Sequence, residues 1–345
     1  MTLTLPKFAR SAALGLALVA TSLTAASAQS ANVREANAGR LGLLSENSIG
    51  TAVQIGDEIS RTLDGRSDLR VVQYITTGSQ KNLKDLMNFR FADMAMMNAD
   101  VLIAEQLRNP DDERLGNIKY LARAFTSELH VVVRQDASFD TVYDLAGRNI
   151  AIGESGSGTS LTSRLVLRAL RVSPRAIELP LADSLVALKR GELDAVFMLY
   201  GKPNGYLASL KPEDGLRLLE VPLTDELAAI YRPAEFTGED YPALVADKLT
   251  QSLAVDVVIA VDEGPSLGYD DRKKLVNFVT ELSGNQQVLA NGPGHHPKWS
   301  EFSFDVEVPR WQRADIVAEV LDGVAPAEEN QESIFDVMKT LEDNG

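Results

Sequence analysis

Residues 150–170 read IAIGESGSGTSLTSRLVLRAL, and this stretch determines the fold that we expect. A short apolar run stops at Gly153, glycines and hydroxyl residues follow, and an amphipathic pattern begins at once. Such a succession predicts a strand, a tight loop and the start of a helix. The loop raises the question of what a set of glycines and hydroxyls holds where a helix begins.

The same succession recurs along the chain on both sides of this stretch. Strands are expected at 39–45 and 68–77, helices at 51–64 and 98–109, and a helix running into a strand at 81–97. Residues 118–125 and 127–136 are separate strand candidates, and 183–200 reads as a helix, a glycine turn and a strand. This alternation predicts an α/β fold whose parallel sheets are covered on both faces.

Two apolar runs rich in β-branched residues, at 128–141 and 252–264, are each followed by polar and acidic residues. In a protein of two lobes whose chain crosses twice between them, the crossing strands have this pattern. Two ordinary core strands have it as well, so the pattern alone leaves both interpretations open.

Composition and the N-terminus restrict the class of protein. The chain of 345 residues carries a formal net charge of −15 and no cysteine. The charge argues against binding to nucleic acids or anionic membranes, and the missing cysteine excludes thiolate chemistry and disulfides. Lys7 and Arg10 precede a short apolar core that ends at Ala26-Ser27-Ala28, which predicts a signal peptide over 1–28 and an exported mature chain. An uncleaved anchor is the alternative.

The glycine-rich loop does not match the catalytic loops that it superficially resembles. Thr159 occupies the lysine position of a P-loop, Leu161 the third glycine of a dinucleotide fingerprint, and Ser157 the second glycine of a nucleophile elbow. Glycines let a backbone approach a ligand, and the first amides of a helix attract negative charge. The loop therefore predicts a site for a small anion, with simple helix capping as the open alternative.

Several motifs together resemble the TAXI-type solute receptors of TRAP transporters. They are GSGT at Gly156–Thr159, GELDAVF at Gly191–Phe197, TTGSQKNL at Thr76–Leu83 and MNADV at Met97–Val101. The resemblance covers about Gly39 to His296. It departs from the family at Glu46–Gln54, where ENSIGTAVQ replaces a loop with paired tyrosines and where Glu46 adds a negative charge.

The resemblance implies a type II periplasmic-binding-protein-like fold, in which two α/β lobes joined by two crossing strands enclose a ligand cleft. Lobe I would comprise 29–128 and 259–323, lobe II 129–258, and residues 324–345 an acidic helix or tail. The implied function is capture of a small organic anion, such as a carboxylate or an amino acid, by lobe closure. Glu46 leaves room for a ligand with an amine. The expected ligand contacts are Ser48, Thr51, Ser79, Asn98, Ser157, Gly158, Thr159 and Tyr200.

The implied partner is the membrane permease of a TRAP system, and the receptor is expected to be a periplasmic monomer without cofactor or metal. Helix capping competes with ligand binding as the role of Ser79. An ABC-type binding protein and a ligand-sensing subunit are the alternative functions. An enzyme is not expected, because the sequence shows no nucleophile with a base and no metal-ligand cluster.

Overall fold

The computed structural model describes residues 39–46, 50–245 and 249–323. The expected signal peptide, Ser48 and the acidic C-terminal segment lie outside these residues. The chain divides into two compact units, 1–40 and 41–345, and the description below concerns the second.

Two sets of parallel strands have the same internal order in one sheet of ten strands. The first set runs β2-β1-β3, and the second runs β6-β5-β7. In each set the strands alternate with helices along the chain, so each is a βαβαβ unit. We call them the β1–β3 half and the β5–β7 half. The β1–β3 half consists of β1 (Arg40–Glu46), α2 (Thr51–Leu63), β2 (Arg70–Thr76), α3 (Ser79–Asn88), β3 (Met94–Asn98) and α4 (Ala99–Arg108). The β5–β7 half consists of β5 (Asn149–Ala151), α5 (Gly158–Ala169), β6 (Arg175–Ile177), α6 (Leu181–Lys189), β7 (Ala195–Tyr200) and α7 (Gly205–Ala208).

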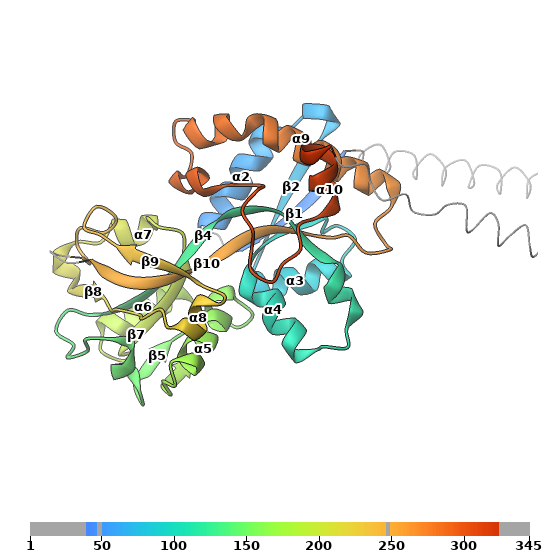
Figure 1. Cartoon of the computed structure of the whole chain (residues 1–345). Coiled ribbons are helices and arrows are strands. Elements are labelled where there is room, and N and C mark those ends of the chain that lie inside the picture. The colour runs from blue at the N-terminus through green and yellow to red at the C-terminus, as the bar shows by residue number, and fades with distance from the viewer. Residues whose placement is uncertain (1–38, 47–49, 246–248, 324–345) are drawn as a thin grey trace, which may run out of the picture. The chain divides into compact units, whose positions relative to one another are not determined.

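Two long antiparallel strands, β4 (Ile118–Arg134) and β10 (Thr250–Asp262), connect the two halves (Figure 1). Strand β10 pairs with β3, and β4 pairs with β7, so each half ends against one of the long strands. The predicted α/β class with two crossing strands is confirmed, and with it the type II periplasmic-binding-protein-like arrangement.

The sheet differs from the sequence prediction in two respects. It is mixed rather than parallel, because β4 and β10 run antiparallel to their neighbours. The strand candidates 118–125 and 127–136 form one strand that ends at Arg134, since Thr126 and Ser127 pair with Asp256 and Val255 of β10 without interruption. In the sequence, the polar Thr126-Ser127 pair suggests that a strand ends there. The backbone hydrogen bonds to β10 nevertheless continue through both residues.

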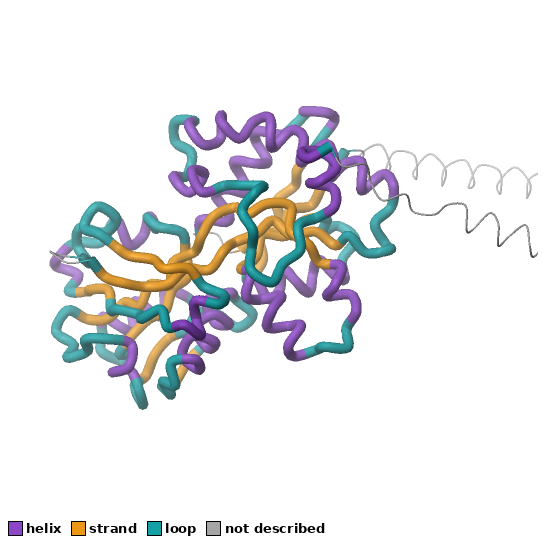
Figure 2. Tube along the Cα trace, viewed as in Figure 1, coloured by secondary structure: helices purple, strands orange, loops and turns teal. Residues whose placement is uncertain are grey.

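Helices flank the strands on both sides (Figure 2). Helix α2 buries Ala52, Ile55, Ile59 and Leu63, which are spaced to form one helical face, in an apolar cluster shared with α9 (Tyr269–Asn291). A second cluster is shared by both halves, because it contains Leu83 of α3 and Leu161 of α5. None of the helices in the described part of the chain is both long and apolar enough to cross a membrane.

The remaining elements are short, with at most five residues each. They are η1 (Arg66–Asp68), η2 (Glu113–Asn117), η3 (Val142–Leu145), η4 (Pro212–Asp214), β8 (Leu216–Leu218), α8 (Asp225–Ala228), β9 (Arg232–Phe236), η5 (Pro297–Glu301), α10 (Asp315–Val317) and η6 (Ala318–Asp322).

Candidate functional site

The carboxyl ends of the parallel strands of both halves meet. The side-chain amide of Gln80, at the start of the helix after β2, donates a hydrogen bond of 3.0 Å to the backbone carbonyl of Ser157, in the loop after β5. The hydroxyl of Thr51, after β1, donates to the carbonyl of Gly201, after β7, at 3.3 Å. In α/β sheets ligands bind outside the carboxyl ends of the strands. We call this region the strand-end site.

The start of α5 is built by the glycine-rich loop. Gly153 and Gly156 both have φ of 82°, a conformation that side chains other than glycine rarely adopt. Ser157 is the N-cap: its hydroxyl accepts a hydrogen bond from the amide of Ser160 at 3.1 Å and donates to the carbonyl of Glu154 at 2.6 Å. The capping role left open by the sequence is therefore present, and it fixes the loop that presents Gly158 and Thr159.

Glycine allows the two halves to approach closely at this point. A Cβ atom at Gly158 would lie 2.2 Å from Nδ2 of Asn98 and 3.0 Å from Oγ of Ser79. A Cβ atom at Gly78 would lie 2.8 Å from Cα of Ser157. Real Cβ atoms do not approach heavy atoms so closely. A larger residue at Gly78 would therefore push against the backbone of the other half, and one at Gly158 would displace the Asn98 side chain.

Ser79, Asn98 and Glu46 form a polar cluster beneath this contact. The Ser79 hydroxyl donates to Glu46 Oε2 at 3.3 Å and accepts from the backbone amide of Asn98 at 3.1 Å. The N-cap of α3 is Gly78, so Ser79 links strand ends rather than capping its own helix. Burial raises the pKa of Glu46 to about 7, against the lowering effect of the hydrogen bonds from Ser79.

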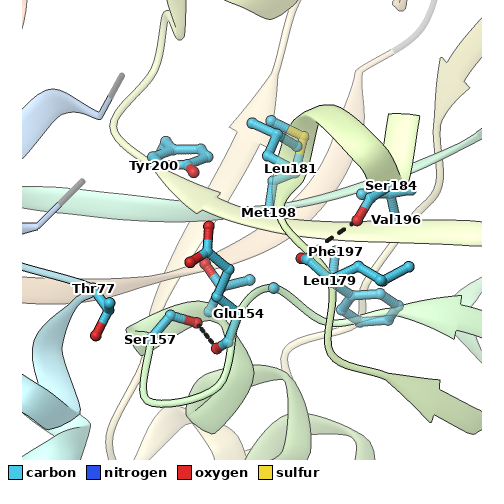
Figure 3. Close-up of a pocket in the computed structure, with 12 residues that line it drawn as sticks. Thr77, Glu154, Ser157, Leu179, Leu181, Ser184, Val196, Phe197, Met198 and Tyr200 are labelled. Atoms are coloured by element: carbon cyan, nitrogen blue, oxygen red, sulfur yellow. Dashed lines mark hydrogen bonds between the residues drawn. The ribbon is translucent and has the colours of Figure 1, made fainter. Parts of the chain in front are cut away.

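A narrow pocket opens beside the start of α5 (Figure 3). Its lining is partly apolar and partly polar. The apolar side chains are Leu179, Leu181, Val196, Phe197 and Met198, and the polar lining comprises Thr77, Glu154, Ser157, Thr159, Ser184 and Tyr200. In the close-up the Glu154 carboxylate extends from the glycine-rich loop into the pocket, toward Tyr200.

The predicted site residues fall into three groups. Ser157, Thr159 and Tyr200 line the pocket. Ser79, Asn98 and Gly158 lie against one another beside it, and Thr51 contacts Gly201. Ser48 lies outside the described residues.

Three polar residues at the site were not among the predicted contacts. Thr77 precedes the Gly78-Ser79 pair, Gln80 follows it, and Glu154 stands inside the glycine-rich loop. These residues could have been predicted from their positions next to the recognised motifs, because residues that adjoin a strand end lie close to the site formed there. The apolar wall gave no such signal, since its residues read as ordinary core.

A family model described as the NMT1-like family matches residues 49–256. This range includes every described residue of the strand-end site except Glu46. The chain belongs to the NMT1-like family.

Solved structures that resemble this NMT1-like protein include three binding proteins. An ArgBP mutant from T. maritima is 14% identical, with 74% of this chain and 93% of that chain covered and a TM-score of 0.47. The arginine-, lysine-, histidine-binding protein ArtJ from Geobacillus stearothermophilus is 13% identical, with 76% and 98% covered and a TM-score of 0.43. The aliphatic sulphonate binding protein SsuA from Escherichia coli is 18% identical, with 85% and 82% covered and a TM-score of 0.41.

A buried carboxylate, Asp100, joins the two halves of the NMT1-like protein away from the pocket. Its Oδ2 accepts hydrogen bonds from Thr162 of α5 at 2.6 Å and from Tyr231 at 3.0 Å. Its Oδ1 has no partner among the described residues. Burial raises the pKa of Asp100 to about 6, although both hydrogen bonds lower it.

Asp100 should make stability depend on pH in a defined direction. Its pKa is about 6 in the folded state, against 3.8 for an aspartate exposed to water, so the folded state holds the proton more tightly. The corresponding stabilisation is present in full below the lower value and is lost as the pH rises through 6. In Asp100→Asn, the amide oxygen still accepts from Thr162 and Tyr231. We therefore expect the unfolding free energy of wild type, measured against this variant, to fall by about 2 kcal/mol between pH 4 and pH 8. Urea denaturation across this range measures it, and parallel profiles would contradict the assignment.

A second buried charge cluster supports the loop after Tyr200. The Lys298 ammonium contacts Glu128 at 2.5 Å, Glu301 at 2.6 Å and the Thr126 hydroxyl at 3.1 Å. The other oxygen of Glu128 accepts from the backbone amide of Lys202 at 2.7 Å. The cluster thus holds η5, β4 and the 201–203 loop together, and it fixes the position of the loop next to the pocket.

Proposed function

We propose that this protein is an extracytoplasmic solute-binding receptor that captures a small organic solute by closure of two lobes. The lobes are 29–128 with 259–323, and 129–258. The observation that carries the proposal is the pocket at the strand ends, whose lining combines Thr77 of the β1–β3 half with Ser157, Thr159 and Tyr200 of the β5–β7 half. A solute held by both halves binds the closed form better than the open form and shifts the population toward it.

The start of α5 is the place for an anionic group of the solute. The amides of a helix's first turn and the partial positive charge of the helix dipole attract a carboxylate. Ser157, Gly158 and Thr159 would hold this group, and Tyr200 would cover it. Ser48, Thr51, Ser79 and Asn98 would contact the solute from the other half.

The partner is the permease of a TRAP system, driven by an ion gradient. Support comes from the TAXI-type motifs, of which GSGT lies at the pocket and TTGSQKNL and MNADV lie at the ends of β2 and β3. Export to the periplasm is supported by the signal-peptide pattern over 1–28. An ABC-type permease is the second candidate. Uptake assays in vesicles that contain the receptor and its permease distinguish the two, because only an ABC system requires ATP.

Thermal-shift measurements with small carboxylates, amino acids and sulfonates test the capture function. A solute that binds the native state raises its melting temperature in proportion to the logarithm of the solute concentration. A melting temperature that no compound in these classes changes would contradict the proposal.

Thr159→Val tests the assignment of the α5 start. Thr159 lines the pocket, and valine has nearly the same shape without the hydroxyl. We expect solute affinity to fall by about 1–3 kcal/mol, because one buried hydrogen-bond donor is lost. Thr280→Val is the matched control, since the Thr280 hydroxyl only bonds the carbonyl of Val276 on the exposed face of α9. Equal calorimetric affinities of Thr159→Val and wild type would remove Thr159 from the site.

A further inference from the structure

The pocket contains negative charge without a cation. Its lining includes Glu154 but no lysine, arginine or histidine among the described residues. Lys298 is a cationic side chain next to Gly201, the residue that follows Tyr200. Its Cγ would lie 3.1 Å from a Cβ atom added at Gly201. Its ammonium, however, is held by Glu128 and Glu301. Basic side chains therefore do not neutralise a second negative charge here.

At the strand-end site a buried acceptor without a donor lies near a carboxylate without a cation. Among the described residues only Ser79 bonds the Glu46 carboxylate, through its hydroxyl at 3.3 Å and through its backbone amide. Asn98 is 1% exposed, and its Oδ1 has no partner among the described residues. Its amide group lies against Gly158, at the contact between the halves. Buried acceptors of this kind cost free energy unless a donor reaches them.

A cationic nitrogen of a ligand supplies hydrogen-bond donors and neutralises negative charge at the same time. A carboxylate or phosphate would add a third negative charge next to Glu46 and Glu154 and would leave the Asn98 oxygen unsatisfied. An ammonium or guanidinium group offers several N–H donors and a positive charge, so it satisfies Asn98 and neutralises Glu46 together. An anionic group of the same solute is still accommodated at the α5 start.

We propose that Glu46 and the Asn98 side-chain oxygen form a subsite for a protonated nitrogen of the solute, with Glu46 as the residue that determines specificity. This inference rests on the proposed capture function and specifies the chemistry of the solute. Glu154, on the opposite half, adds negative charge to the pocket and thereby also favours a solute with a cationic nitrogen. The receptor selects a nitrogen-containing solute over the analogue in which oxygen replaces that nitrogen.

The test compares matched solutes on the full mature chain. The ammonium probes are putrescine and the proteinogenic amino acids whose side chains lack nitrogen, and the nitrogen-free probes are the corresponding 2-oxo acids and dicarboxylates. We expect at least one ammonium probe to raise the melting temperature and to bind at least tenfold more tightly, by calorimetry, than its nitrogen-free counterpart. Binding of nitrogen-free probes with equal or higher affinity overturns the inference and leaves the capture function intact. A melting temperature unchanged by every probe contradicts the capture function itself.

Glu46→Gln tests the residue directly. Glutamine keeps the size and one acceptor oxygen but removes the charge. We expect affinity for the ammonium probe to fall at least tenfold and the preference over its nitrogen-free counterpart to shrink. Glu192→Gln, an exposed substitution beyond α6, is the matched control and should bind as wild type does. An unchanged preference in Glu46→Gln, with the melting temperature of the free protein showing that it folds, overturns the assignment.

Discussion

Lys298→Met lowers the free energy of unfolding by about 3–5 kcal/mol, the largest loss of stability that we expect from a single substitution in this protein. Methionine fills a similar volume, so the loss comes from charge rather than from a cavity. The side chain of Lys298 is only 3% exposed, and the side chain of its partner Glu128 is 4% exposed. Removal of the ammonium leaves the Glu128 carboxylate buried without a counter-charge, and burial already raises its pKa.

Chemical denaturation in urea measures the effect, with two comparisons. Lys189→Met is the matched control, because Lys189 pairs with Asp214 at the surface, where such pairs contribute about 0–1 kcal/mol. The triple variant Lys298→Met, Glu128→Gln, Glu301→Gln removes the unpaired charges, so it should recover part of the lost stability. A loss below about 1 kcal/mol in Lys298→Met would show that Glu128 does not depend on Lys298 as a buried counter-charge.

The sequence predicted those parts of the fold that depend on local patterns. Strand β1 follows from a short apolar run, helix α2 from a helical face and the start of α5 from a glycine-rich loop. Each of these patterns lies within one short stretch of the sequence. Strands of three residues such as β6 and β8 are too short to show a period, and they form because neighbouring strands pair with them. The continuity of β4 likewise depends on β10, which is remote in the sequence.

The site was predictable to the extent that each residue stands in its own motif. Ser79, Asn98 and Ser157 were identified separately, but the sequence does not indicate which of them touch. Gly158 packs against Asn98, and Lys298 pairs with Glu128 across 170 positions. The contact between Gly158 and Asn98 arises from the meeting of two halves with equivalent strand orders, and that repetition is not visible in the sequence.

The shared strand order gives a physical reason for the position of the site. Each βαβαβ half directs the carboxyl ends of its strands, and the helix starts that follow them, toward one edge. In this protein the two edges meet, so Thr51 and Ser79 of one half face Gly201 and Gly158 of the other. Glycine occurs at 78, 158 and 201 because a side chain there would overlap with the facing half or with Lys298.

Gly158→Val should weaken solute binding at least a thousandfold, equivalent to about 4 kcal/mol. The first carbon of the new side chain would already lie 2.2 Å from Nδ2 of Asn98, and two methyl groups would follow it. Relief of this overlap requires the Asn98 side chain to turn away or the β1–β3 half and α5 to separate, and either change removes contacts that a solute makes to this site. Since the solute is bound by the closed form, the cost of the overlap appears directly as lost affinity.

Gly205→Val is the matched control for this substitution, because both glycines are the first residues of helices. A Cβ atom at Gly205 has no other atom within 4 Å, so the control tests valine at a helix start without the overlap. We expect it to keep wild-type affinity in calorimetry. In the presence of solute, small-angle scattering should give a larger radius of gyration for Gly158→Val than for Gly205→Val. Wild-type affinity in Gly158→Val would mean that the contact between Gly158 and Asn98 is not maintained when the solute binds. The solute would then bind away from the start of α5.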